Sequence, residues 1–194
     1  MTGLDEALFQ ALNGLAGRWP VLDGLARLVV NDYLAPSTLA LMLVWMWVRG
    51  ATPPQRQSDT AAVLNAIVAQ FLANVILKAV NLVYFRPRPF DADPGVSLLF
   101  YRPWDSSFPS NPATFAFAVA TAIYLGDRRL GRWALCVAGL WALARVFCGV
   151  HYPSDVLAGA LLGSSMAFVV SRGFSAWARL RDRLVSLLRE LLVA

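Results

Sequence analysis

The sequence is poor in charge and in the side chains that bind transition metals. Its 194 residues include one histidine and two cysteines, and only 15% of them are charged. One histidine without a cysteine cluster cannot supply the usual ligands of a zinc site, so no metal centre is expected. Cys136 and Cys148 lie roughly 18 Å apart if their segment is helical, which is too far for a disulfide. Because a soluble domain is roughly 25% charged, the composition argues against a soluble enzyme.

Hydrophobic residues take the place of the missing charge. They make up 58% of the chain, and the mean hydropathy is +0.54. Residues 20–33 are either the lower half of a first membrane span or a separate half-buried helix. The sequence predicts an all-α fold, a single polytopic membrane helical bundle over residues 1–194 with five or six transmembrane helices. The apolar stretches, judged against the roughly 20 residues that cross a bilayer, are 34–48, 60–85, 112–126, 132–150 and 153–171.

Both ends of the chain predict amphipathic helices. Residues 4–16 are typical of a short helix on the membrane surface, and the N-terminus lacks the basic start and apolar core of a signal peptide. In residues 174–193, apolar side chains recur at helical spacing among arginines. This pattern favours an interfacial helix over a helix that docks a partner protein.

The net charge is +5, and the arginines that produce it are unevenly distributed along the chain. They are concentrated in 49–59, in 127–132 and in the C-terminal helix, so the positive-inside rule predicts that these segments are cytoplasmic. Segment 86–111, which is long, polar and rich in proline, then faces outward. The basic charge needs no nucleic acid as a partner. The expected partners are membrane lipids, and the oligomeric state is left open.

A polar stripe runs along the predicted span 60–85. Gln70, Asn74, Lys78 and Asn81 follow one another at spacings of three or four residues, which places them on one side of a helix. Lys78 alone could reach the membrane surface with its long side chain. Because the whole stripe is polar and a lysine in an apolar span usually faces a polar interior, we predict a polar groove here.

Two further features flank the outward segment. Arg86 and Arg88 alternate with prolines, and arginine suits phosphate because its planar donors bind two oxygens at once. A basic membrane flank is the equal alternative. Ser110 or Asn111 is suited to cap the next helix, with Pro112 in its first turn. A helix start attracts anions, but taken alone these residues are better explained as an ordinary cap.

The fourth feature contains the single histidine. Arg145 precedes His151 by six residues, and Asp155 follows it by four. A lone histidine in a turn is usually structural. Here, however, a carboxylate is near enough to fix the imidazole tautomer, which would leave the other ring nitrogen free as a nucleophile. Neighbouring arginines would then hold a phosphoryl group.

Together these motifs resemble the phosphatidic acid phosphatase type 2 superfamily of membrane lipid phosphatases, and within it the bacterial undecaprenyl-diphosphate phosphatases. The likeness covers residues from about 60 to 172. It rests on RPRPF at 86–90, DSSFPSNPATF at 105–115 and ARVFCGVHYPSD at 144–155. The resemblance implies an enzyme of the bacterial inner membrane whose active site faces the periplasm and needs neither metal nor cofactor.

The same resemblance implies roles for individual residues. His151 would be the nucleophile that forms a phosphohistidine, and Asp155 would orient it. The phosphate would be bound by Arg145, Arg88 and Ser110 with its adjoining backbone. The substrate-binding residues expected around them are Lys78, Asn81, Arg86 and Asn111.

The chain departs from the family pattern in three places. Asn81 stands where the first motif, Lys-x6-Arg-Pro, has its lysine, so either Lys78 or Arg86 would supply the missing charge. Ala144 replaces a serine, which is a mild loss. Pro112 stands where the second motif has a histidine, the expected general acid, and proline cannot donate a proton.

The missing acid bears on the substrate. A lipid monophosphate expels an alkoxide, which needs a proton in the transition state, and general acid catalysis is worth roughly 10²–10⁴-fold. A diphosphate expels a phosphate ester, whose relevant pKa is only about 6. We therefore expect a preference for prenyl diphosphates. The alternative is a lipid-phosphate binding or transport protein that has lost hydrolysis and kept anion recognition.

Overall fold

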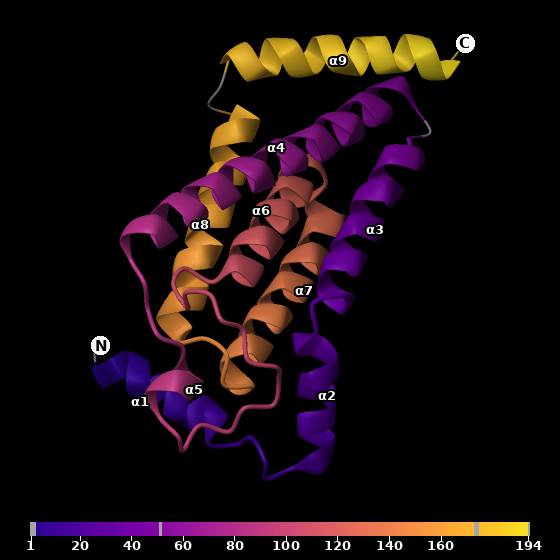
Figure 1. The fold of residues 1–194 in the computed structure, drawn as a ribbon. Helices are drawn as coiled ribbons and strands as arrows, with labels where there is room; N and C mark the ends of the chain where they lie inside the picture. The colour runs from indigo at the N-terminus through magenta and orange to yellow at the C-terminus, as the bar shows by residue number, and fades with distance from the viewer. Residues whose placement is uncertain (1–2, 51, 173–174, 194) are drawn as a thin grey trace.

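The structure is a computed structural model that describes residues 3–50, 52–172 and 175–193, and within these ranges it contains helices and no strands. This confirms the all-α fold. Figure 1 shows the helices running between two ends of the molecule, with α9 lying across one of them. In chain order they are α1 (Gly3–Asn13), α2 (Pro20–Val30), α3 (Leu34–Val48), α4 (Pro53–Val83), α5 (Pro89–Ala92), α6 (Asn111–Gly126), α7 (Arg128–Phe147), α8 (Pro153–Arg172) and α9 (Ser175–Val193).

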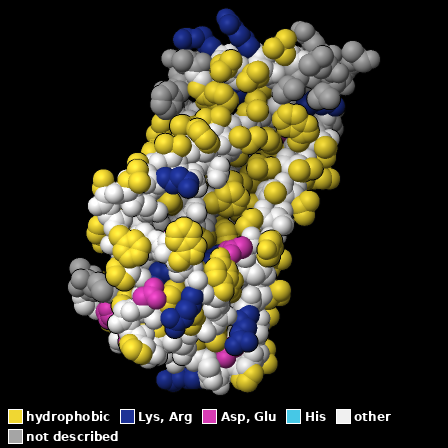
Figure 2. Space-filling model, in the orientation of Figure 1, with side chains coloured by type: hydrophobic (Ala, Val, Ile, Leu, Met, Phe, Trp, Pro, Cys, Tyr) yellow, Lys and Arg dark blue, Asp and Glu magenta, His cyan; other side chains and the backbone are white. Residues whose placement is uncertain are grey.

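Three helices, α4, α7 and α8, are long and apolar enough to cross a bilayer. The pair α2 and α3 passes the same test when taken together, but it is bent by 50°. The 16 residues of α6 fall short of a full span. The predicted number of five or six spans is therefore not confirmed. Figure 2 shows hydrophobic side chains over the middle of the visible face, as expected for a protein in lipid.

Residues 20–33 contain the helix α2 and the bend that separates it from α3. Asn31 ends the first helix, and its Oδ1 accepts hydrogen bonds from the backbone N–H groups of Tyr33 and Leu34, both at 2.8 Å. An asparagine that satisfies the free N–H groups of a new helix starts that helix in a new direction. Residues 20–30 thus form a separate helix, α2, which is bent by 50° from α3.

Helix α6 lies at the centre of the bundle, between α4, α7 and α8 (Figure 1). Its contact with α8 is close because α8 has glycines there. A Cβ added at Gly163 would lie 2.3 Å from the carbonyl oxygen of Thr114, and one added at Gly159 would lie 2.5 Å from that of Ser110. The two glycines therefore fix how near α8 stands to the start of α6.

Helix α1 is docked on the bundle more firmly than a surface helix would be. Phe9 is buried, and Asn13 at its end holds two other segments together. The side-chain amide of Asn13 donates to the carbonyl oxygens of Ser97 (2.9 Å) and Phe147 (2.8 Å), while its Oδ1 accepts from the backbone N–H of Ser97 (3.0 Å). Helix α1 thus joins the long segment after α5 to the end of α7.

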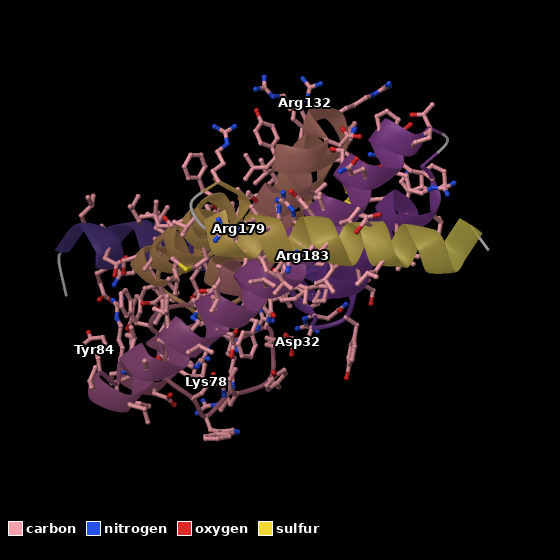
Figure 3. The ribbon with its side chains drawn as sticks, turned by 90° about the horizontal axis from the view of Figure 1, so that it is seen from above. Asp32, Lys78, Tyr84, Arg132, Arg179 and Arg183 are labelled. Atoms are coloured by element: carbon pink, nitrogen blue, oxygen red, sulfur yellow. The ribbon has the colours of Figure 1, made fainter. Side chains whose placement is uncertain are left out.

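Helix α9 covers the opposite end. Its Trp177 donates a hydrogen bond to Asn65 of α4 at 2.9 Å, and Val185 is buried, while Leu180 and Leu187 are exposed. Figure 3, which looks onto this end, shows Arg179 and Arg183 along α9. The exposed leucines suit the interfacial position that the sequence predicts, which stays a prediction. Phe174, where that predicted helix began, lies outside the described residues.

Candidate active site

The candidate site is assembled where α7 turns into α8. Helix α7 ends at Phe147, and Gly149 takes the left-handed φ of +80° that lets the chain reverse. The backbone N–H of Val150 donates to the carbonyl oxygen of Arg145 at 3.0 Å, which closes the turn. Pro153 then starts α8. His151 lies within this turn and is only 1% exposed, so its ring is held inside the protein.

The two ring nitrogens of His151 have different surroundings. Nδ1 lies 3.0 Å from the carbonyl oxygen of Ser107, which can only accept, so Nδ1 carries the proton. Nε2 is then unprotonated, and it lies 3.2 Å from Nη1 of Arg88. Burial lowers the pKa of His151 well below its usual value, and the positive charges of Arg88 and Arg145 lower it further. The ring is therefore neutral, with a lone pair on Nε2.

Asp155 acts on His151 through Ser107. The carboxylate lies 3.9 Å from Nδ1, beyond hydrogen-bond distance. Instead, the hydroxyl of Ser107 donates to Oδ2 of Asp155 at 2.5 Å, and the backbone N–H of Tyr152 donates to the same oxygen at 2.9 Å. Asp155 thus fixes the residue whose carbonyl oxygen holds the imidazole. Ser107 was not among the residues that the sequence singled out.

The two arginines of the RPRP segment have different surroundings. Arg88 is 4% exposed and faces His151, and it also donates to the carbonyl oxygen of Val150 at 3.1 Å. On the other edge of the guanidinium, Nη2 donates to Oδ1 of Asp105 at 2.7 Å and Nε donates to the backbone oxygen of Asp105 at 3.0 Å.

Arg86 points to a different group of side chains. It donates to Oδ1 of Asp155, to the hydroxyl of Ser154 (2.7 Å) and to Oδ2 of Asp5 (2.7 Å), and it lies over the ring of Tyr152. Asp5 also accepts from the backbone N–H of Ser154 at 2.9 Å. Burial opposes the charged form of Asp5, but these hydrogen bonds outweigh burial and lower its pKa. Arg86 is therefore engaged by two carboxylates.

Arg145 is buried at 2% exposure and forms an ion pair with Asp32, which comes from the break between α2 and α3. The hydroxyl of Tyr101 donates to the other oxygen of Asp32 at 2.7 Å. The guanidinium also lies over the ring of Phe100, with 4.8 Å between its central carbon and the ring centroid. Its Nε is buried without a hydrogen-bond partner among the described residues. Asp32 belongs to no sequence motif and was missed for that reason.

A cavity of about 370 Å³ adjoins Asp105. Lys78 and Asn81 line it from α4, and Asn111 lines it from the start of α6. These three were predicted as substrate-binding residues, and Figure 3 labels Lys78 near the end of α4. The amide oxygen of Asn81 is buried and unpaired among the described residues. The remaining lining residues are Leu77, Tyr101, Pro103, Trp104 and Asp105.

Ser110 is placed differently from these three residues. It is fully buried and serves as the cap of α6, where its hydroxyl accepts from the backbone N–H of Ala113. Its own N–H donates to the carbonyl oxygen of Asp155 at 3.0 Å, so it ties α6 to α8. Pro112 follows in the first turn of α6.

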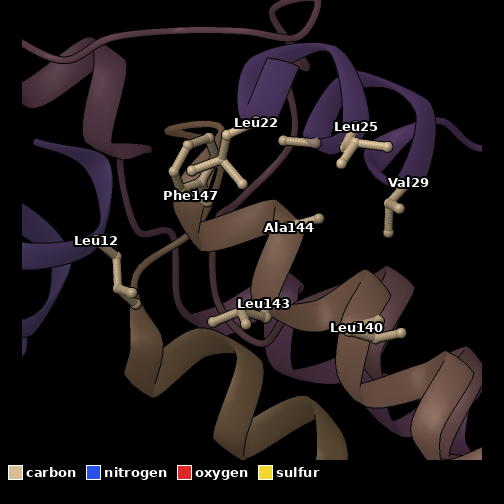
Figure 4. Close-up of a pocket in the computed structure, with 9 residues that line it drawn as sticks. Leu12, Leu22, Leu25, Val29, Leu140, Leu143, Ala144 and Phe147 are labelled. Carbon is tan, nitrogen blue, oxygen red and sulfur yellow. The ribbon is translucent and has the colours of Figure 1, made fainter. Parts of the chain in front are cut away.

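A second cavity of about 210 Å³ lies between α2 and α7, with Leu12 at its edge (Figure 4). Its walls are apolar, and none of the predicted site residues lines it. Elsewhere within the described ranges, no three histidine, cysteine or acidic side chains are grouped so that they could hold a metal ion. The predicted catalytic residues therefore lie at the turn between α7 and α8, away from this apolar cavity.

Comparison with known proteins finds similarity over most of the chain. The family model of the PAP2 superfamily matches residues 60–179. Undecaprenyl-diphosphatase BcrC of Bacillus subtilis is 34% identical over 170 residues, which cover 87% of this chain and 83% of that protein. The bacitracin transport permease protein BcrC of Bacillus licheniformis is 30% identical over 84% of this chain and 76% of that protein. The crystal structure of LpxE from Aquifex aeolicus has a TM-score of 0.68 at 26% identity, covering 88% of this chain and 96% of that one.

Proposed function

This chain belongs to the PAP2 superfamily of membrane lipid phosphatases, and from that premise we propose that it hydrolyses a polyprenyl diphosphate through a phosphohistidine on His151. One observation carries the proposal. The unprotonated Nε2 of a buried, neutral His151 faces the guanidinium of Arg88, while Nδ1 is held by a carbonyl oxygen. A lone pair beside a fixed positive charge is what attack on a phosphoryl group requires.

The first chemical step follows from this geometry. Nε2 of His151 attacks the terminal phosphorus, the P–N bond forms, and the bridging P–O bond breaks. Its electron pair leaves with the prenyl monophosphate. Arg88 lies at hydrogen-bond distance from the attacking nitrogen and is placed to bind a phosphoryl oxygen. The Nδ1–H bond to Ser107 supports the imidazolium that forms on the phosphorylated ring.

Lys78 is the better candidate for the charge that Asn81 lacks in the first motif. It lines the 370 Å³ cavity together with Asn81. Arg86 already binds Asp5 and Asp155, so a phosphate would have to compete with two carboxylates for it. We call residues 148–152, between α7 and α8, the catalytic turn. We therefore propose that Arg86 positions the catalytic turn and that Lys78 binds the substrate.

The selectivity for a diphosphate rests on Pro112. A monoester needs a proton on its departing oxygen, and the proline at the start of α6 cannot give one. A prenyl phosphate leaves as a much weaker base and needs less help. We expect a clear preference for a short prenyl diphosphate over phosphatidic acid. Equal rates on the two substrates would contradict this selectivity.

The orientation is also a proposal. The catalytic turn and the end that α9 covers lie at opposite ends of the molecule (Figure 1). Arg49 pairs with Asp59 and Asp127 at the α9 end, where the sequence places its short basic loops. The positive-inside rule then places the active site on the periplasmic side of a bacterial inner membrane.

The decisive experiment measures phosphate release from farnesyl diphosphate by purified protein in detergent with excess EDTA. Wild type should release phosphate and acquire an acid-labile, base-stable label from terminally labelled substrate. His151→Ala should do neither, whereas Cys136→Ala, a change at an exposed thiol, should match wild type. Unchanged release by His151→Ala, or release that requires an added metal, would overturn the proposed mechanism.

A second candidate function is binding or transport of a lipid phosphate without hydrolysis. Pro112 favours it because the usual proton donor is gone, and one relative bears the name of a transport permease. Pro112→His separates the two functions. A large gain in phosphate release supports a hydrolase that works without its acid. Tight binding of the prenyl diphosphate with no turnover in either form supports the carrier.

A further inference from the structure

Hydrolysis of a phosphohistidine needs a base as well as a nucleophile. In the second half of the reaction, a water molecule attacks phosphorus and must lose a proton as it does so. General base catalysis of such a step is worth roughly 10²–10⁴-fold. In this chain the second motif supplies Pro112, and His151 is the only histidine, so no imidazole is left for this task.

Four aspartates surround the catalytic turn, and three of them have both oxygens engaged. Asp155 binds Arg86, Ser107 and the N–H of Tyr152. Asp5 binds Arg86 and Ser154 through its two oxygens. Asp32 binds Arg145 with one oxygen and Tyr101 with the other. Each oxygen of these three carboxylates already accepts at least one hydrogen bond from the protein, which makes it a weaker base.

Asp105 is different. Its Oδ1 accepts a hydrogen bond from Arg88, and its Oδ2 accepts none from the described part of the chain. The side chain is 46% exposed and lines the 370 Å³ cavity. This cavity also reaches Asn111, next to the position where the second motif has its histidine. Asp105 is therefore accessible to water and borders the cavity that reaches the start of α6.

One guanidinium links Asp105 to the nucleophile. Nη2 of Arg88 holds Oδ1 of Asp105 at 2.7 Å, while Nη1 lies 3.2 Å from Nε2 of His151. The carboxylate and the attacking nitrogen are thus separated by one guanidinium and two hydrogen bonds. The backbone oxygen of Asp105 also binds Nε of Arg88, so the residue is fixed at two points.

We propose that Asp105 is the general base that activates water to hydrolyse the phosphohistidine, an inference that rests on the proposed function. The water oxygen bonds to phosphorus, and the P–Nε2 bond breaks with its electron pair returning to His151. The water proton passes to Oδ2 of Asp105, and inorganic phosphate leaves. Asp105 thereby does the work that a histidine at position 112 would do in this half of the reaction.

The test separates the two half-reactions by rapid quench with terminally labelled farnesyl diphosphate. Asp105→Asn keeps an oxygen for Arg88 but cannot take a proton. It should label at a rate close to wild type, lose its label about 10²–10⁴-fold more slowly, and accumulate phosphohistidine in the steady state. Asp91→Asn, at an exposed carboxylate of α5, is the matched control and should behave as wild type.

Two rescues distinguish a base from a residue that only holds Arg88. Formate added to Asp105→Ala should speed the loss of label, because a small carboxylate fits the vacated volume. Pro112→His placed in the Asp105→Asn background should restore hydrolysis of the intermediate. A residue that only holds Arg88 would give neither rescue, and it would slow labelling and loss of label together.

The outcomes separate this inference from the proposed function. If wild type neither labels nor releases phosphate, the proposed function fails. If wild type turns over normally and Asp105→Asn shows wild-type rates in both half-reactions, the inference alone fails. It also fails if Asp105→Asn slows both half-reactions equally, since Asp105 would then only position Arg88.

Discussion

The guanidinium of Arg145 is neutralised by the carboxylate of Asp32, which the chain supplies from the break between α2 and α3. Arg145 is one of the residues predicted to bind phosphate, and it is almost fully buried. A carboxylate on a buried arginine occupies donors that a phosphoryl oxygen would use. Asp32 therefore satisfies Arg145 when the site is free and competes with an anionic ligand when one arrives.

Removing the carboxylate of Asp32 should strengthen phosphate binding but weaken the folded state. Asp32→Asn should make inorganic phosphate a stronger inhibitor, because a neutral amide competes less well for Arg145. It should also lower the free energy of unfolding by about 1–3 kcal/mol, since a buried charge loses its counterion. Inhibition constants and thermal unfolding followed by circular dichroism measure the two effects.

The control for Asp32 is Asp182→Asn, which removes a carboxylate from an exposed ion pair on α9. Exposed pairs contribute about 0–1 kcal/mol, so neither property should change appreciably. An Asp32→Asn protein with weaker phosphate inhibition would show that Asp32 helps to bind the ligand.

Substitutions at Lys78 and at Arg86 should affect different properties of the protein. Lys78→Gln should raise KM for a prenyl diphosphate by roughly tenfold, which corresponds to about 1.4 kcal/mol, and should leave the melting temperature unchanged. Arg86→Gln leaves Asp5 and Asp155 without their cation, and breaking a buried pair costs about 3–5 kcal/mol. It should therefore unfold at a lower temperature and lose activity. If Arg86→Gln instead raised KM without changing the melting temperature and Lys78→Gln lowered the melting temperature, Arg86 would be the substrate-binding residue and Lys78 the structural one.

Burial makes His151 a source of acid sensitivity. Its pKa is lowered in the folded protein, first by burial and then by Arg88 and Arg145, from about 6.5 in the unfolded chain. When the pH falls below about 6.5, His151 binds a proton in the unfolded state but not in the folded state, so the free energy of unfolding decreases. The loss begins near pH 6.5 and continues down to the folded pKa.

The measurement compares wild type with His151→Gln, whose side chain does not titrate. From pH 7.5 to pH 5, wild type should lose up to about 1.4 kcal/mol per pH unit more than the variant. Parallel stability curves for the two proteins would mean that His151 titrates alike in the folded and unfolded chain.

The contact between α6 and α8 predicts a sharp contrast between two glycines. At Gly163 a new Cβ would meet the backbone of Thr114 at 2.3 Å and that of Ala118 at 2.7 Å. Gly163→Ala should therefore push the helices apart and cost about 1–3 kcal/mol of stability. Gly139→Ala on α7 meets nothing within 4 Å and should be neutral or slightly stabilising. Equal melting temperatures would contradict the close packing.

The turn between α7 and α8 could be singled out from the sequence because its candidate residues are near one another along the chain. Arg145, His151 and Asp155 fall within one helix end, one turn and one helix start, so their approach follows from local structure. The helix types and most helix boundaries followed from apolar runs in the same way. The number of spans did not, because α6 is short and the α2–α3 pair is bent by 50° after Asn31, which caps a new helix.

The residues that sequence reasoning missed come from distant segments. Asp32 and Asp5 reach the site only through tertiary packing, and none of the quoted motifs contains them. Ser107 lies within the motif at 105–115, but its contacts with His151 and Asp155 join segments more than 40 residues apart. The sequence also left open whether Lys78 or Arg86 supplies the charge that the first motif lacks, and it did not show that Arg86 and Arg88 have different surroundings. Arg88 has φ −77° and ψ 159°, the polyproline II conformation, in which residues two apart point in different directions. The side chain of Arg88 therefore reaches His151, while that of Arg86 reaches Asp5 and Asp155.

Helix α1 has a consequence for how the protein opens. Asn13 clamps the end of α7 and Asp5 binds the start of α8, so both sides of the catalytic turn depend on a helix at the other extreme of the chain. Amide hydrogens of α1 and of residues 148–155 should thus exchange with deuterium as one cooperative unit. A tag or deletion that loosens α1 would then disturb the nucleophile without touching any residue of the catalytic turn.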